Sequence, residues 1–191
     1  GVSRTEDFAE SSLLVDIGGG SVEFIVVDND TDVYRASLKL GAARMTEQFV
    51  TTDPLSEDEQ ARMRAHFKAE LSEVAAAARA HGVTTIVGSS GTMKSLVRTT
   101  QAQQGEGDRR PFQRDFPVAQ VRSALRWVMQ ATADEREAHP AIEPRRVDQI
   151  GAGAVLLDTL CAGLPSVASV RVSRSALREG MVAHFIDTNY A

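Results

Sequence analysis

Two carboxylates, three glycines and a hydroxyl lie within one short segment near the start of the chain. Asp16 ends an apolar run, three glycines follow it, and Glu23 comes shortly after Ser21. Glycine lets a backbone turn tightly and approach a ligand, and the N–H groups of such a turn form a concavity that binds anions. Carboxylate oxygens are ligands for a hard cation such as Mg²⁺. The segment therefore predicts a phosphate and metal site, with Asp16 and Glu23 as catalytic and metal-binding acids and Gly18, Gly19, Gly20 and Ser21 as phosphate ligands.

The residues around these glycines separate this turn from other glycine-rich loops. The dinucleotide loop G-x-G-x-x-G needs a helix after it, and here Glu23 occupies the position of the third glycine. Residues 22–27 are rich in β-branched and aromatic side chains, which is typical of a strand. The segment also lacks the Lys-Ser/Thr ending of a P-loop. We interpret it as the tip of a β-hairpin that grips phosphate; an ordinary hairpin turn is the alternative.

A second turn of glycine and hydroxyl residues follows another apolar segment. It contains Ser90, Gly91 and Thr92, and we expect a helix to begin near Thr92. Because a helix N-terminus attracts anions, this turn predicts a second phosphate or nucleotide contact. A plain N-cap by Thr92 is the alternative. Lys94 and Arg98 would lie on the first turns of this helix, where we favour a solvated face over contact with a polyanion.

The bulk composition is that of an ordinary globular domain. The chain has 191 residues, of which 42% are apolar and 25% charged, enough for one sizeable core. Its net charge of −5 argues against general nucleic-acid binding, which draws most of its affinity from a basic surface. No apolar run approaches the ~20 residues of a membrane span. We expect the single cysteine, Cys161, to be a core thiol and the protein to be cytoplasmic.

The order of expected strands and helices predicts an α/β domain that positions the two turns. Ser56 and Glu59 form the capping box of a long helix, which Gly82 ends. Helices packed on a mixed sheet are the architecture that this order implies. The other expected elements are an antiparallel meander of strands at 13–17, 22–28 and 33–39, a short helix within 41–50, a strand at 83–87, a polar excursion at 101–116, helices at 118–130, 147–163 and 178–187, and a strand at 167–172.

Five segments carry motifs that occur together in one known family. They are DIGGGS-x-E within 14–23, an LGAVRLTE-like stretch at 40–47, the glycine turn at 88–92, R-x-D-x-I-x-x-G at 146–153 and S-x-x-A-L-R-E-G at 173–180. In this order, and over nearly the whole chain, they resemble the exopolyphosphatase/guanosine pentaphosphate phosphatase (Ppx/GppA) family. The resemblance implies a ribonuclease H-like, actin/Hsp70-type ATPase half, with a mixed sheet, an antiparallel meander and flanking helices.

The family resemblance also implies a reaction. It is the release of terminal phosphate from polyphosphate or guanosine pentaphosphate, with Mg²⁺ or another divalent cation, and with Asp16 and Glu23 as the functional acids of this half. Two alternatives are a non-catalytic module that binds polyphosphate or alarmone, and half of a sugar or acetate-type kinase. One residue departs from the pattern, because Val22 stands where the family usually has Thr or Ser.

Members of the family begin with an additional domain, which carries its own phosphate loop and the glutamate regarded as catalytic base. This chain therefore resembles a C-terminal half. We expect residues 1–12 to be a linker from a missing N-terminal domain and residues 13–191 to form one domain. The isolated chain would then be inactive, and the resemblance further suggests a homodimer.

Overall fold

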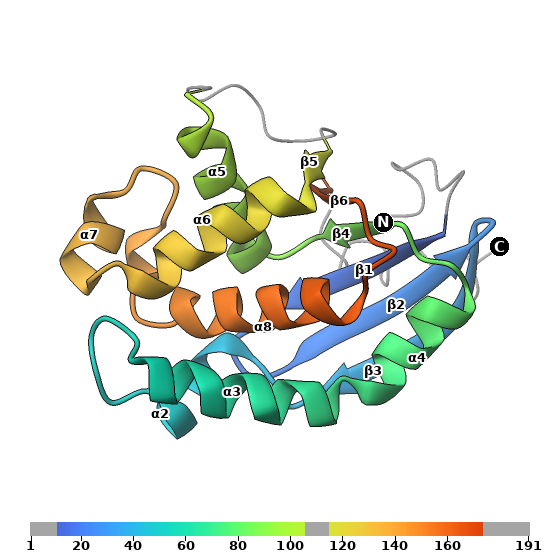
Figure 1. Cartoon of the computed structure of the whole chain (residues 1–191), viewed down its shortest axis with the longest axis horizontal. Coiled ribbons are helices and arrows are strands. Elements are labelled where there is room, and N and C mark those ends of the chain that lie inside the picture. The colour runs from blue at the N-terminus through green and yellow to red at the C-terminus, as the bar shows by residue number, and fades with distance from the viewer. Residues whose placement is uncertain (1–10, 106–114, 174–191) are drawn as a thin grey trace, which may run out of the picture.

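The computed structural model describes residues 11–105 and 115–173, in which the strands form one mixed sheet (Figure 1). The strands are β1 (Ser12–Ile17), β2 (Val22–Asp28), β3 (Thr31–Leu38), β4 (Thr85–Gly88), β5 (Phe116–Pro117) and β6 (Ser169–Val172). They lie in the order β3-β2-β1-β4-β6-β5. β2 pairs antiparallel with both β1 and β3, whereas β4 runs parallel to both β1 and β6. The predicted meander within a mixed sheet is confirmed.

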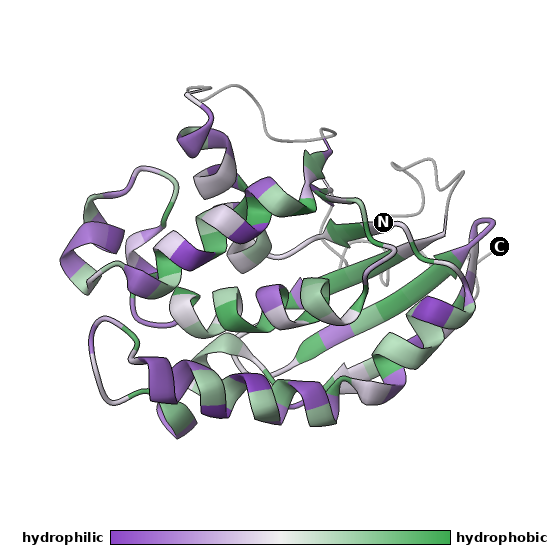
Figure 2. Ribbon diagram, in the orientation of Figure 1, coloured by the Kyte–Doolittle hydropathy of each residue, from purple (hydrophilic) through white to green (hydrophobic). Residues whose placement is uncertain are grey.

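Helices pack on the sheet through buried apolar side chains. They are α2 (Ala42–Phe49), α3 (Glu57–Glu70), α4 (Ser72–Ala80), α5 (Gly91–Gln103), α6 (Val118–Gln130), α7 (Ala133–Ala138) and α8 (Ile150–Gly163), with a 3₁₀ turn η1 (Pro144–Arg146). Figure 1 shows α3 and α8 crossing in front of the sheet. The core between these layers includes Leu13, Phe24, Phe67 and Leu157, all fully buried. Figure 2 shows the matching hydrophobic colour along β1 and β2.

The long helix predicted from Ser56 is confirmed at both ends but is kinked in the middle. Ser56 and Glu59 make the reciprocal capping box, and Gly82 follows the last turn with φ +63°. At Leu71 the backbone leaves helical geometry (φ −87°, ψ 3°), which divides α3 from α4. The bonds from Leu71 N to Phe67 O and from Ala75 N to Leu71 O persist at 2.9 and 2.8 Å. The interruption is therefore a kink in a continuous hydrogen-bonded path.

Other boundaries differ from the sequence predictions. The predicted polar excursion at 101–116 overlaps the end of α5 and the first residue of β5, and residues 106–114 lie outside the described part. The helix predicted at 147–163 begins at Ile150, after η1, and the six-residue α7 was not predicted. β1 begins at Ser12, the last residue of the predicted linker. Residues 1–10 and the helix predicted at 178–187 are not among the described residues.

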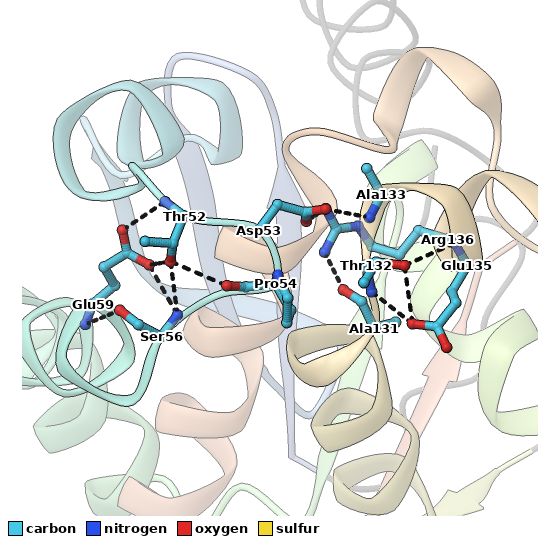
Figure 3. Close-up of polar contacts among 10 residues, drawn as sticks. All are labelled: Thr52, Asp53, Pro54, Ser56, Glu59, Ala131, Thr132, Ala133, Glu135 and Arg136. Carbon is cyan, nitrogen blue, oxygen red and sulfur yellow. Dashed lines mark hydrogen bonds and ion pairs between the residues drawn. The ribbon is translucent and has the colours of Figure 1, made fainter.

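A polar clamp, formed by Asp53 with Arg136 and Ala133, joins the loop before α3 to α7 (Figure 3). The Asp53 carboxylate accepts hydrogen bonds from Arg136 Nη2 and from the backbone N–H of Ala133, both at 2.7 Å. Arg136 Nη1 donates to the carbonyl of Ala131 at 2.7 Å. Thr132 and Glu135 form a second capping box. The clamp fixes the loop before α3, in which Leu55 lies against Gly151 in the first turn of α8.

Glu59 holds the α3 side of this clamp together. Its buried carboxylate accepts hydrogen bonds from backbone N–H groups of Thr51, Thr52 and Ser56 at 2.6–3.0 Å. The hydroxyls of Thr51 and Thr52 donate to it as well, at 2.9 and 2.6 Å. Burial alone would raise the pKa of Glu59. The hydrogen bonds from Thr52, Thr51 and Ser56 lower the pKa by a larger amount, so it lies well below its usual range. The carboxylate is thus ionised at neutral pH.

Candidate functional site

The two predicted acids face each other across the first hairpin. Asp16 and Glu23 are directly paired residues of β1 and β2, so their side chains leave the same face of the sheet. Both residues are half-buried. Like charges directly opposite each other destabilise a strand pair. This pair therefore favours a cation between or beside the two carboxylates.

Hydroxyl groups surround both carboxylates. Ser89 Oγ donates to Asp16 Oδ2 at 3.0 Å. Ser37 Oγ donates to Glu23 Oε1 at 3.0 Å, and Ser21 Oγ donates to the same oxygen. Ser37 and Ser89 were not predicted as site residues. Ser37 could have been found only through strand register, because it is the β3 partner of Glu23.

The glycine turn is the tip of a hairpin, as predicted. The N–H of Gly18 donates to the carbonyl of Ser21 at 3.0 Å, and β1 and β2 continue from the turn as an antiparallel pair. The strand after the turn excludes the dinucleotide-binding arrangement, which needs a helix there. Val22 is fully buried in the core. The hydroxyl that the family usually carries at this position would therefore point away from the turn, into the core.

The carbonyl groups of the turn dock on the N-terminus of α2. The carbonyl of Gly18 accepts from Ala42 N at 2.9 Å, and that of Gly19 accepts from Arg44 N at 3.0 Å. The carbonyl of Gly20 accepts from Gly41 N at 3.3 Å and from Arg44 Nε at 3.1 Å. The N-terminus of α2 thus fixes the orientation of three successive peptide groups of the turn.

This docking determines where the N–H groups of the turn point. In a planar trans peptide the C=O of one residue and the N–H of the next point in opposite directions. With the carbonyls of Gly18, Gly19 and Gly20 directed at α2, the N–H groups of Gly19, Gly20 and Ser21 are directed away from it. Gly19 and Gly20 are exposed. The turn thus presents consecutive N–H groups on its open side, an arrangement that suits an anion.

Two glycines at this turn have opposite surroundings. A Cβ on Gly41 would lie under 3.0 Å from the backbone of Gly19 and Gly20, so only glycine allows the turn to dock on α2. A Cβ on Gly20 would meet nothing within 4 Å, and Gly20 has no positive φ. Neither packing nor backbone geometry in the described chain requires glycine at position 20. A glycine at such an open position allows close approach of a ligand.

The second turn lies beside the first but is built differently from the prediction. Ser90, and not Thr92, is the N-cap of α5, because its hydroxyl accepts from Met93 N at 3.1 Å. The same oxygen accepts from Ile17 N at 3.2 Å, which joins the two turns. Thr92 is buried. Both bonds use the Ser90 oxygen as an acceptor, so its O–H can still donate to a phosphate, together with backbone N–H groups of the turn.

A basic residue that was not predicted as a site residue covers the second turn. Arg146 Nη1 donates to Thr92 Oγ1 at 3.2 Å, and Arg146 Nε donates to Glu143 Oε2 at 3.2 Å. A Cβ on Gly91 would clash with the Arg146 guanidinium. Arg146 belongs to one of the five family motifs. Its position over Gly91 could not be predicted, because it depends on how the chain folds back between α5 and α8. Lys94 and Arg98 are half-buried, so they are only partly on the solvated face that we favoured for them.

The acid pair fits a hard divalent cation. Mg²⁺ usually takes one or two carboxylates, keeps several waters and binds substrate phosphate. Asp16 and Glu23 supply two carboxylates, and the exposed N–H groups of the neighbouring turn leave space for phosphate. Within residues 11–105 and 115–173, no group of three or more His, Cys, Asp or Glu side chains gathers as a metal cage. The donor set thus fits a cation shared with water and substrate.

Comparisons with known proteins identify the family of this chain. Residues 1–189 match the model of the Ppx/GppA phosphatase family. The chain belongs to this family. It is 32% identical over 176 residues to exopolyphosphatase 1 of Mycobacterium leprae, covering 91% of the chain and 51% of that protein. It is 33% identical over 177 residues to the uncharacterized protein SCO0757 of Streptomyces coelicolor, covering 91% and 52%. The chain thus spans about half the length of the curated relatives that it matches.

Solved structures of family members share the fold. An exopolyphosphatase from Cytophaga hutchinsonii superposes with a TM-score of 0.85 at 26% identity, covering 98% of this chain and 61% of that one. The Aquifex aeolicus Ppx/GppA phosphatase superposes with a TM-score of 0.80 at 25% identity, covering 96% and 59%. The predicted actin-type α/β fold is confirmed. Among the described helices, none has the length and apolar character needed to cross a bilayer.

Proposed function

We propose that this Ppx/GppA chain is the half of a phosphohydrolase that holds the phosphate and the cation. The enzyme would release terminal phosphate from polyphosphate or guanosine pentaphosphate. The observation that carries the proposal is the glycine turn, whose N–H groups point away from α2 beside the Asp16–Glu23 pair. Membership of the family and similarity to an exopolyphosphatase support it.

Each group has a defined task in such a reaction. Hydrolysis of a phosphoanhydride needs positioning of the phosphoryl group and neutralisation of the charge on its oxygens. The N–H groups of Gly19, Gly20 and Ser21 would donate to those oxygens. Asp16 and Glu23 would hold Mg²⁺ or another divalent cation, which supplies charge neutralisation when bound. Ser21, Ser37 and Ser89 orient the two carboxylates through their hydroxyl groups.

The turn at the start of α5 would provide a second contact. Its donors would be the O–H of Ser90 and the backbone N–H groups of Gly91 and Thr92, because capping uses Ser90 only as an acceptor. Activation of the attacking water is assigned to the glutamate of the N-terminal domain that family members carry. For this reason we expect the isolated chain to be inactive.

The test is phosphate release by the full-length protein from each substrate, with Mg²⁺ present and after its removal by a chelator. We expect release from at least one substrate, and loss of release with the chelator. No release from either substrate in the presence of Mg²⁺ would reject the enzymatic proposal. The sequence upstream of Gly1 in the gene gives a second test, since it should contain another glycine-serine phosphate loop and a glutamate.

A second candidate is a binding module that senses polyphosphate or alarmone without turnover. The chain spans about half the length of its curated relatives, which favours this candidate, because the glutamate regarded as catalytic base would lie in the other half. Binding of polyphosphate by residues 1–191 without hydrolysis, together with an inactive full-length protein, would support this candidate. Rapid turnover by residues 1–191 alone would contradict both the module and the expected inactivity. The match to a phosphatase family gives the kinase alternative no support.

Assembly and location follow from the family resemblance as further proposals. We propose a homodimer, which sedimentation of the full-length protein would test. The core position of Cys161 supports a reducing compartment such as the cytoplasm. Fractionation of the source cells would test that location.

A further inference from the structure

Arg44 occupies an unfavourable place for a basic side chain. It is the third residue of α2, at the positive end of the helix dipole, where acidic residues are preferred. The first turn of α2 contains no acidic residue. Arg44 is exposed, and in the described ranges no ion pair joins it to a carboxylate. Another function must therefore explain a cation at this position.

Arg44 holds the glycine turn through both its backbone and its side chain. Its N–H donates to the carbonyl of Gly19 at 3.0 Å, and its Nε donates to the carbonyl of Gly20 at 3.1 Å. The other donor to the Gly20 carbonyl, Gly41 N, is more distant at 3.3 Å. Glycine tolerates nearly any backbone orientation, so the Gly20–Ser21 peptide needs an external bond to keep one direction.

We propose that Arg44 is a positioning residue for the phosphate-binding turn. This inference rests on the proposed phosphohydrolase function. The Nε–H of Arg44 holds the Gly20 carbonyl toward α2, so that the N–H of Ser21 faces the phosphoryl group. Arg44 itself makes no contact with the reacting atoms in this role.

The test uses the full-length protein with Arg44→Ala and Arg44→Lys. Misplacing a group by about 1 Å can cost about 10²-fold in rate, so we expect Arg44→Ala to lower kcat for phosphate release by about that factor. Arg44→Lys, whose ammonium can also donate to the Gly20 carbonyl, should lose much less. Guanidinium chloride at non-denaturing concentrations should restore part of the rate of Arg44→Ala. A denaturant would not rescue a variant that was merely destabilised.

The matched control is Arg126→Ala, which removes an exposed arginine of α6 and should leave kcat unchanged. Thermal melting of each variant checks folding. If wild-type protein is active but Arg44→Ala keeps a kcat within threefold, or shows no rescue, the assignment of Arg44 is overturned. If wild-type protein releases no phosphate at all, the proposed function fails, and the assignment of Arg44 fails with it.

Discussion

Two alanine substitutions at the glycine turn separate a ligand-binding role from a structural one. Gly20 and Gly41 lie on opposite sides of the same contact between the turn and α2. A new Cβ at Gly20 enters open space, whereas a new Cβ at Gly41 enters the backbone of Gly19 and Gly20. The same chemical change should therefore have opposite effects on stability.

The expected sizes follow from these surroundings. Replacing glycine by alanine where the backbone permits it stabilises a protein by about 0.4–1 kcal/mol, because the unfolded chain loses freedom. For a chain of this size 1 kcal/mol is about 2–4 °C in Tm, so Gly20→Ala should raise Tm by about 1–4 °C. Overpacking against rigid backbone costs about 1–3 kcal/mol, and alanine is also a poor N-cap. Gly41→Ala should therefore lower Tm by about 4 °C or more.

Activity should not follow stability. A methyl group at position 20 would occupy the open side of the turn, where we place the phosphate. We expect Gly20→Ala to reduce kcat/KM for phosphate release by about 10²-fold or more, the cost of losing a preorganised donor. The measurements are thermal unfolding of the 191-residue chain and phosphate release by the full-length protein, for both variants.

Two outcomes would contradict these expectations. If Gly20→Ala keeps a kcat/KM within twofold of wild type, the open side of the turn does not hold the substrate. If Gly20→Ala unfolds several degrees below wild type, the turn in solution differs from the structure described here. A more stable but inactive Gly20→Ala protein would be difficult to explain by any structural role of that glycine.

Three further predictions test other parts of the chain. Asp16→Ala and Glu23→Ala should each lower turnover of the full-length protein by at least ~10²-fold, and near-normal rates would reject these acids as site residues. Glu59→Gln should lower the unfolding free energy by about 2–3 kcal/mol through its lost charged hydrogen bonds, with exposed Glu57→Gln as control. Because the folded pKa of Glu59 lies below the unfolded value of 4.5, its contribution is complete above about pH 5 and declines as pH falls below 4.5; equal urea midpoints for the variant and wild type would contradict this. Burial and the neighbouring charge of Asp158 raise the pKa of the Cys161 thiol to about 12, so a thiol reagent at neutral pH should label it only after unfolding, and rapid labelling of the folded chain would disprove its core position.

Local patterns were enough to predict the elements that carry the first turn. The β-branched run after the glycines identified β2, and the capping box at Ser56 placed the start of α3 to the residue. The acids Asp16 and Glu23 are neighbours because a four-residue hairpin tip fixes the register of its strands. These features depend on residues that are close together in the sequence, so the sequence alone was enough to predict them.

The features that were missed depend on distant contacts or on competition between neighbours. Ser90 and Thr92 are both residue types that cap helices well. Ser90 is the cap in the structure, and its hydroxyl oxygen also accepts a bond from the distant Ile17 N. Arg146 reaches Thr92 from more than fifty residues away. The helix α7 is too short for a periodic pattern, although its capping box at Thr132 was a usable signal.

The docking of the turn on α2 also resolves a conflict between the net charge of the chain and the polyanionic substrate that we propose. A chain with a net charge of −5 has no evident means of attracting a polyanion. A helix N-terminus carries about half a positive charge in its unpaired N–H groups. Here the carbonyls of Gly18, Gly19 and Gly20 take up donors of that end, so the peptide dipoles of the turn align with the helix dipole. The N–H groups on the far side of the turn then become the positive end. The positive potential of the helix end therefore acts at the open side of the turn, beside the Asp16–Glu23 pair. An anion can be attracted there although the net charge of the chain is negative.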